Sequence, residues 1–186
     1  MTREDILEAA AQVFRQKGFH GASMNDIAHA VNLQKASLYH HVSSKQEILL
    51  ELLDRALILL NERISAIVNQ TLPSDEKLRR MIREYLQILA ENMDLAAVLL
   101  FEHRALERRH HARHVPNRDR FEALWRGVIA DGVRQNVFRC EDPALAARAL
   151  FGVMNWTLTW YRPTGALNIE QIADQYSDLL LNGLLK

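Results

Sequence analysis

The stretch from residue 23 to residue 47 constrains the fold most, because it combines signals for a helix start, a tight turn and another helix start. Ser23 and Ser44 are each followed three residues later by an acid, the pattern of a capping box at a helix N-terminus. Asn32 lies between them, and asparagine adopts the left-handed conformation of a tight turn more readily than most residues. The pattern predicts a short helix, a turn, a second short helix over residues 34–41 and the start of a third, which is a helix-turn-helix arrangement.

Helical periodicity continues through the rest of the chain. An apolar stripe runs from Ile6 to Phe14, and Gly18 is placed to end that helix. Residues 44–70 carry a longer stripe, about 40 Å of helix, which predicts a connector between two domains. Further helices are predicted over residues 74–89, 95–106, 118–136, 143–161 and 169–185. The expected fold class is all-α, with an N-terminal three-helix helix-turn-helix domain, a C-terminal helical domain and about nine helices.

The composition indicates the cellular location of such a chain. Glycine and proline number only seven and four, which suits helices joined by short loops. The single cysteine, Cys140, excludes an intramolecular disulfide, and the N-terminal residues are amphipathic and acidic rather than a basic and apolar signal. No apolar run reaches the length of a transmembrane helix. We therefore expect a cytoplasmic protein with no membrane partner.

Motifs that would indicate catalysis do not occur in the sequence. Cys140 precedes Glu141 and Asp142, whose negative charges disfavour a thiolate. The chain has no Gly-rich phosphate loop, no metal-ligand set and no nucleophile motif. The sequence therefore predicts a protein that is not an enzyme and that has no catalytic residues, no cofactor and no metal site.

Residues 23–49 resemble the DNA-binding signature of the TetR family of transcriptional repressors. The matching positions are Ser23, Ile27, Ala28, Leu38, Tyr39, His41 and Lys45. The chain departs from the family pattern at Asn32 in place of a turn glycine, at Gln34 in place of serine, and at Val42 in place of phenylalanine. These departures concern the details of base contact and leave the resemblance intact.

The resemblance implies that residues 1–46 form a DNA-binding domain and residues 47–186 a ligand-binding and dimerisation domain. Lysine, serine and tyrosine donate to phosphate oxygens, whereas Gln34 can pair with adenine and Lys35 can reach guanine in the major groove. A solvated helix face is the alternative for each of these side chains. The residues placed at the DNA are Ser23, Gln34, Lys35, Ser37, Tyr39, His40 and Lys45, the last on a phosphate.

Parts of the second domain resemble one branch of the family. Residues 102–106, 118–119 and 155–165 are similar to repressors of fatty-acid, phenylacetate and sterol catabolism that respond to acyl-CoA thioesters. The resemblance implies a small-molecule effector of that kind, with the tryptophan and methionine side chains lining an apolar tunnel; simple core packing is the alternative for them. The candidate ligand-binding residues are Met93, Glu102, His103, Arg104, Trp125, Met154, Trp156, Trp160 and Arg162.

Residues 103–114 are dense in arginine and histidine, and three interpretations stay open. The segment suits an anion-binding mouth for the phosphates of CoA, because guanidinium groups bind phosphate bidentately. It also suits a solvated, charged helix face. His110 and His114 are spaced like zinc ligands on a helix, although no acidic or cysteine ligand completes a site.

The mechanism implied by these features is repression as a homodimer. The formal net charge is zero, so DNA affinity depends on presenting two recognition helices to a palindromic double-stranded operator. Residues 143–161 and 169–185 carry more apolar surface than one subunit's core needs, which predicts the dimer interface. An effector would tilt the helix over residues 44–70 and release the operator. The alternatives are a regulator of efflux genes that responds to drugs or other apolar compounds, and a DNA-binding protein without a small ligand.

Overall fold

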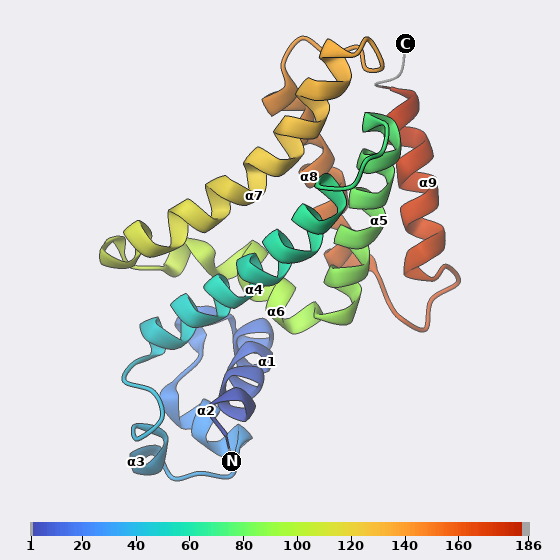
Figure 1. Ribbon diagram of the computed structural model, residues 1–186. Helices are drawn as coiled ribbons and strands as arrows, with labels where there is room; N and C mark the ends of the chain where they lie inside the picture. Colours follow the sequence, from blue (N-terminus) through green and yellow to red (C-terminus); the bar gives the residue numbers. More distant parts are fainter. Residues whose placement is uncertain (1, 184–186) are drawn as a thin grey trace. The chain divides into compact units, whose positions relative to one another are not determined.

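The computed structural model describes residues 2–183, which form nine α-helices with short π-helical and 3-10 segments after the sixth (Figure 1). The all-α prediction is therefore confirmed. The elements are α1 (Arg3–Gly21), α2 (Met24–Ala30), α3 (Lys35–Leu38), α4 (Lys45–Val68), α5 (Ser74–Glu91), α6 (Met93–Ala97), the π-helix η1 (Val98–Glu102), the 3-10 helix η2 (His103–Ala105), α7 (Arg108–Arg134), α8 (Pro143–Trp160) and α9 (Ile169–Asn182).

Capping residues set most of the helix starts, as the sequence predicts. Thr2 and Ser23 form capping boxes with Asp5 and Asp26. The predicted box at Ser44 is only half formed: the Ser44 hydroxyl accepts the Glu47 N–H at 3.1 Å, but the Glu47 carboxylate turns to the backbone N–H and hydroxyl of Ser43. These Ser43 hydrogen bonds lower the pKa of Glu47 from its ordinary value.

Several expected helices differ in the structure. The predicted helix over residues 95–106 is divided among α6, η1 and η2, and the Arg/His segment joins the following helix to make α7. Pro116 lies inside α7, although proline removes a backbone donor. Gly18 does not end α1 but kinks it at φ 70°, and the chain continues in helix to Gly21. The predicted end of the last helix, residue 185, lies outside the described residues.

The chain divides into two compact units. Unit 1 comprises residues 1–58 and 92–117, and unit 2 comprises residues 59–91 and 118–186. The core of unit 1 is built by α1, α2, α3 and the first half of α4, and it also contains Val98 and Leu106. The segment 92–117, expected in the second domain, therefore packs with the helix-turn-helix helices. The functional boundary after residue 46 stays a prediction.

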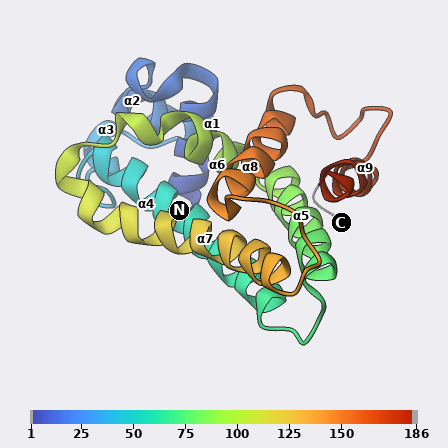
Figure 2. The same cartoon turned by 90° about the horizontal axis from the view of Figure 1, so that it is seen from above.

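Unit 2 is built around α5. Leu78, Met81, Ile82, Tyr85, Leu86 and Leu89 form the buried face of α5, as the sequence predicts. Helix α5 contacts α8 and α9, and Figures 1 and 2 both show α5 and α9 side by side. Within residues 2–183, no helix combines the length and the apolar character needed to cross a membrane.

Candidate nucleic-acid interface and effector site

The helix-turn-helix is fixed by its core, which leaves one face of α3 to solvent. Asn32 has the left-handed φ of 54° that the predicted turn requires. Leu38 is fully buried and anchors α3 in unit 1. The side chains predicted to face DNA from this helix divide by burial: Gln34, Lys35, Tyr39 and His40 are exposed, and Ser37 is half-buried.

The start of α2 uses Ser23 as a cap rather than leaving it free. The Ser23 hydroxyl accepts the Asp26 N–H at 3.1 Å and donates to the Asp26 carboxylate at 2.6 Å. Lys17 from the end of α1 lies 2.5 Å from the same carboxylate and is the main cause that holds the pKa of Asp26 well below its ordinary value. Asp26 therefore stays ionised at neutral pH and ties α1 to the start of α2.

Lys45 has structural partners within the protein. Its Nζ donates to the carbonyl oxygens of Phe19 and Ala22, each at 2.6 Å, and lies 4.4 Å from the centroid of the Phe19 ring. An ammonium group has three N–H donors, so one of them stays available for a phosphate oxygen. The phosphate contact of Lys45 stays a prediction, and the structure adds to it a role in holding the end of α1.

Replacing Lys45 by alanine is expected to have two effects. The free energy of unfolding falls by about 1–3 kcal/mol, because two partly buried carbonyl groups lose a charged donor. The slope of log K against log salt for operator binding falls by about 0.9 per subunit, because one phosphate contact is lost. Urea unfolding and salt titrations of operator binding measure these quantities.

Lys77 supplies the matched control in unit 2, since its Nζ caps the carbonyl of Val68 at 2.7 Å. Lys77→Ala should destabilise the protein and leave the salt slope as it is. An unchanged slope in Lys45→Ala would contradict the phosphate contact.

The predicted ligand residues do not gather in one unit. Met93, Glu102, His103 and Arg104 belong to the segment that packs in unit 1, whereas the other five belong to unit 2. The Glu102 carboxylate accepts the backbone N–H of Phe19 at 2.9 Å, and His103 Nδ1 lies 3.2 Å from the Leu99 carbonyl. Arg104 is exposed.

In unit 2, the predicted ligand residues separate by burial. Trp125 and Met154 are fully buried, whereas Trp156 and Trp160 are 66% and 43% exposed on α8. Arg162 is also exposed, beyond the end of α8. The exposure of Trp156 and Trp160 could not be predicted from periodicity, because α8 is apolar on nearly all sides.

Four aromatic side chains form a cluster in the core of unit 2: Tyr85, Phe121, Trp125 and Phe151, with ring centroids 5.2–6.2 Å apart. We call it the aromatic cluster. The Tyr85 hydroxyl donates to Asn155 Oδ1 at 2.6 Å. Burial raises the pKa of Tyr85, so this hydroxyl stays a neutral donor.

Trp125 places a polar atom inside the aromatic cluster. Its Nε1 is buried and has no hydrogen-bond partner among the described residues. A buried donor left without an acceptor is costly, so a ligand oxygen arriving there would be stabilised. Apart from Trp125, the sequence analysis did not select the members of this cluster. Their only signal is an aromatic residue on the apolar stripe of each of three predicted helices.

The Arg/His segment is mostly exposed to solvent, and two of its side chains lie near a carboxylate of α4. Arg113 pairs with Asp54 of α4 at 2.7 Å, and the buried His114 lies 3.9 Å from the same carboxylate. Asp54 was missed by the sequence analysis, although an acid in the long apolar stripe of residues 44–70 is a usable signal. Within the described part of the chain, no group of three His, Cys, Asp or Glu side chains is arranged to hold a metal ion.

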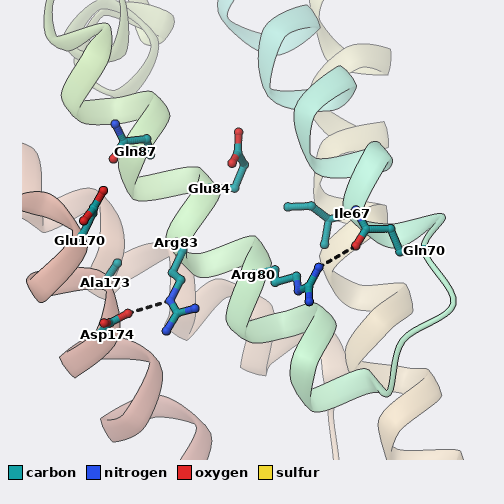
Figure 3. Close-up of a pocket in the computed structure, with 9 residues that line it drawn as sticks. All are labelled: Ile67, Gln70, Arg80, Arg83, Glu84, Gln87, Glu170, Ala173 and Asp174. Atoms are coloured by element: carbon teal, nitrogen blue, oxygen red, sulfur yellow. Dashed lines mark hydrogen bonds and ion pairs between the residues drawn. The ribbon is translucent and has the colours of Figure 1, made fainter.

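A groove of about 610 Å³ lies in unit 2 among the end of α4, α5 and α9 (Figure 3). Figure 3 shows Arg83 of α5 pointing to Asp174 of α9, at 2.7 Å, and Arg80 pointing to Gln70, at 3.1 Å. The lining is mostly charged, and none of the predicted ligand residues belongs to it. Its chemistry does not suit an acyl chain, which needs apolar walls.

A helix-turn-helix unit joined to a helical domain with an aromatic core defines a class of one-component transcriptional regulators. The chain belongs to the TetR family: residues 6–52 match the model of bacterial regulatory proteins of the tetR family, and residues 71–184 match the tetracyclin repressor-like C-terminal domain. It is therefore a DNA-binding transcriptional repressor with a ligand-binding domain, and it is not an enzyme.

Relatives of this chain span nearly its whole length. The repressor KstR2 of Rhodococcus jostii is 29% identical over 184 residues, 98% of this chain and 90% of the relative. The solved structure of the regulator PfmR from Thermus thermophilus is 38% identical with a TM-score of 0.87, covering 97% of this chain and 99% of that one. AibR in complex with isovaleryl coenzyme A and operator DNA is 27% identical with a TM-score of 0.89, covering 96% and 97%.

Proposed function

We propose that this protein is a cytoplasmic repressor that binds a palindromic operator as a homodimer and is released by an acyl-CoA thioester. The observation that carries the effector class is the similarity, over 96% of the chain, to AibR, a protein solved with isovaleryl coenzyme A and operator DNA. KstR2 and the fatty acid metabolism regulator of Bacillus subtilis are further full-length relatives.

The aromatic cluster supports an acyl effector. Its rings form an apolar environment in unit 2, and the unpaired Trp125 Nε1 is a donor within it. An acyl-CoA thioester presents a complementary pair of groups, an apolar chain and one carbonyl oxygen beside it. We assign the acyl chain to the cluster and the thioester oxygen to Trp125.

The dimer proposal is supported by the exposed side chains of α8 and α9. Leu145 and Trp156 on α8 and Leu179 on α9 are each more than 60% exposed, although large apolar side chains are normally inside. A side chain added at Gly152 would meet nothing within 4 Å, so this face of α8 is open to close approach. Exposed apolar side chains on α8 and α9 fit contact with the same surface of a second copy.

The alternative of a regulator that responds to cationic drugs is not favoured. It would need an acidic group in the apolar site, and Glu102 was the candidate in the sequence. The structure instead places the Glu102 carboxylate on the backbone of Phe19 in unit 1.

Thermal unfolding with a series of acyl-CoAs tests the proposal. At 100 times the dissociation constant, the matching acyl-CoA should stabilise the protein by about 2.7 kcal/mol. For a chain of this length this raises Tm by roughly 5–10 °C. Free CoA and the free acid are the controls and should give little shift. If the Tm with every acyl-CoA equals the Tm of the ligand-free protein, the effector proposal is wrong.

A further inference from the structure

The bend near the end of α1 is held from both sides by charged side chains. We call residues Gly18–Ala22 the elbow. Gly18 adopts φ 70° and ψ 159°, which interrupts the helical hydrogen bonding and leaves nearby peptide groups in need of partners. A residue other than glycine would be strained at that φ. The bend at the elbow is therefore specified by the glycine at position 18.

The side chains that bind the elbow have charges that suit its peptide groups. A carboxylate accepts from an N–H, and an ammonium group donates to two carbonyl oxygens. The Phe19 N–H donates to Glu102 Oε2 at 2.9 Å, and the carbonyls of Phe19 and Ala22 accept from Lys45 Nζ at 2.6 Å. Hydrogen bonds to ionised groups are roughly twice as strong as neutral ones. The Phe19 ring is buried and packs 5.3 Å from the ring of Phe14, centroid to centroid. The backbone and side chain of Phe19 are thus both anchored.

The elbow determines where α2 begins. Ser23, the cap of α2, follows Ala22 directly, and α2 in turn contacts α3, the recognition helix. A shift of the elbow therefore moves the start of the two helices that present side chains to DNA. Lys45 is the first residue of α4 and Glu102 the last of η1, so two separate elements determine this position.

The element that carries Glu102 has an unusual geometry. η1 is a π-helix, a rare form that occurs mostly as short segments at functional sites. A change of η1 to α-helical hydrogen bonding would shift its end by one residue, about 100° of rotation and 1.5 Å of rise. That shift would carry the Glu102 carboxylate away from the Phe19 N–H. η1 therefore offers two discrete arrangements of one contact.

The chain connects η1 directly to the proposed effector site. Asn92 alone separates the end of α5 from α6, and η1 follows α6 without a break. α5 carries Tyr85, a member of the aromatic cluster. A ligand that changes α5 can therefore bias η1 along the chain, through the single non-helical residue Asn92, provided that it binds one arrangement better than the other.

We propose that Glu102 is a positioning residue that holds the elbow in its DNA-binding conformation, and that the effector releases DNA by withdrawing this carboxylate from the Phe19 N–H. The first half concerns DNA binding alone. The second half rests on the proposed function, because it requires an acyl-CoA effector.

The experiment compares Glu102→Ala, Glu102→Gln and the control Glu107→Ala. Glutamine keeps an oxygen acceptor, whereas alanine removes it. Glu107 is a nearby carboxylate that pairs with Arg109 at 2.7 Å on the surface. For each protein, operator affinity is measured with and without saturating isovaleryl-CoA, and the hydrogen exchange of the ¹⁵N-labelled Phe19 amide is followed by NMR.

Without effector, Glu102→Ala should bind the operator about tenfold more weakly and exchange the Phe19 amide faster, since one charge-assisted hydrogen bond is lost. Glu102→Gln should recover most of the operator affinity and most of the protection of the Phe19 amide. Glu107→Ala should equal wild type in both measurements. The factor by which isovaleryl-CoA weakens operator binding should shrink in Glu102→Ala, because that variant already populates the released arrangement. If Glu102→Ala does not fold, Glu102→Gln carries the test: a small loss of operator affinity with faster Phe19 exchange supports the positioning role, and a glutamine variant equal to wild type overturns it.

The outcomes separate the two claims. An operator affinity and a Phe19 exchange rate unchanged in Glu102→Ala would overturn the positioning role. A wild-type protein that acyl-CoA does not release would contradict the proposed function and the effector half, while the effect of Glu102→Ala without effector would still decide the first half. A purely structural role would lower stability and leave the acyl-CoA response factor equal to wild type, which also overturns the effector half.

Discussion

Replacing Trp156 by glutamate is expected to give a monomer that binds its operator at least about 100-fold more weakly than wild type. A monomer presents one recognition helix, so it loses the avidity of two linked helices on one operator. Trp156 is 66% exposed on α8, and Leu145 of α8 and Leu179 of α9 are exposed large apolar side chains as well. Buried aromatic anchors dominate the energy of such interfaces. In a two-fold interface each substitution occurs twice, so two uncompensated carboxylates would enter the same apolar contact.

Two variants control for this prediction. Trp156→Phe keeps an aromatic anchor and should stay dimeric, and Leu167→Glu places the same charge at an exposed apolar site in the loop between α8 and α9. Sedimentation equilibrium measures the mass, and fluorescence anisotropy measures operator affinity. A Trp156→Glu protein that sediments as the dimer, or a wild type that is monomeric, would show that this face of α8 is not the interface.

Replacing Tyr85 by alanine is expected to lower the free energy of unfolding by about 3–5 kcal/mol, because it removes a buried ring and leaves a cavity in the aromatic cluster. Tyr85 is buried against three rings and donates to Asn155. The same substitution removes the donor that Asn155 Oδ1 accepts. Urea unfolding followed by far-UV circular dichroism measures the loss.

Tyr85→Phe separates the ring from the hydroxyl. It keeps the aromatic contacts and should cost only about 1–3 kcal/mol, the penalty for leaving the Asn155 oxygen without its donor. If both variants lose the same stability, the hydroxyl rather than the ring holds this core. If neither loses stability, the aromatic cluster is not the centre of unit 2.

Local signals in the sequence predicted most of the secondary structure, because their physics is local. The caps at Thr2 and Ser23 act within one helical turn, and the turn at Asn32 depends on one residue's backbone preference. The buried face of α5 follows from a 3.6-residue period with one polar side. Each of these features is specified by residues close together in the chain.

Features that depend on contacts between distant residues were not predictable in this way. Glu102 lies 83 residues from Phe19, and its charge alone suggested a ligand site rather than a backbone contact. The sequence predicted that Lys45 contacts a phosphate. No residue near it in sequence indicated that its ammonium group also donates to two carbonyl oxygens of the elbow. α8 is apolar on nearly all sides, so its pattern could not separate the half-buried position of Phe151, which packs against Trp125, from the exposed position of Trp156.

The most direct test of the account is operator release measured by fluorescence anisotropy. The protein first selects its operator from a library of random duplexes, and the labelled operator complex is then titrated with isovaleryl-CoA, longer acyl-CoAs, free CoA and the free acids. At least one acyl-CoA is expected to lower the anisotropy to that of free DNA, whereas CoA and the acids should not. A complex that keeps its full anisotropy at saturating concentrations of every acyl-CoA would contradict the central claim that this repressor responds to acyl-CoA thioesters.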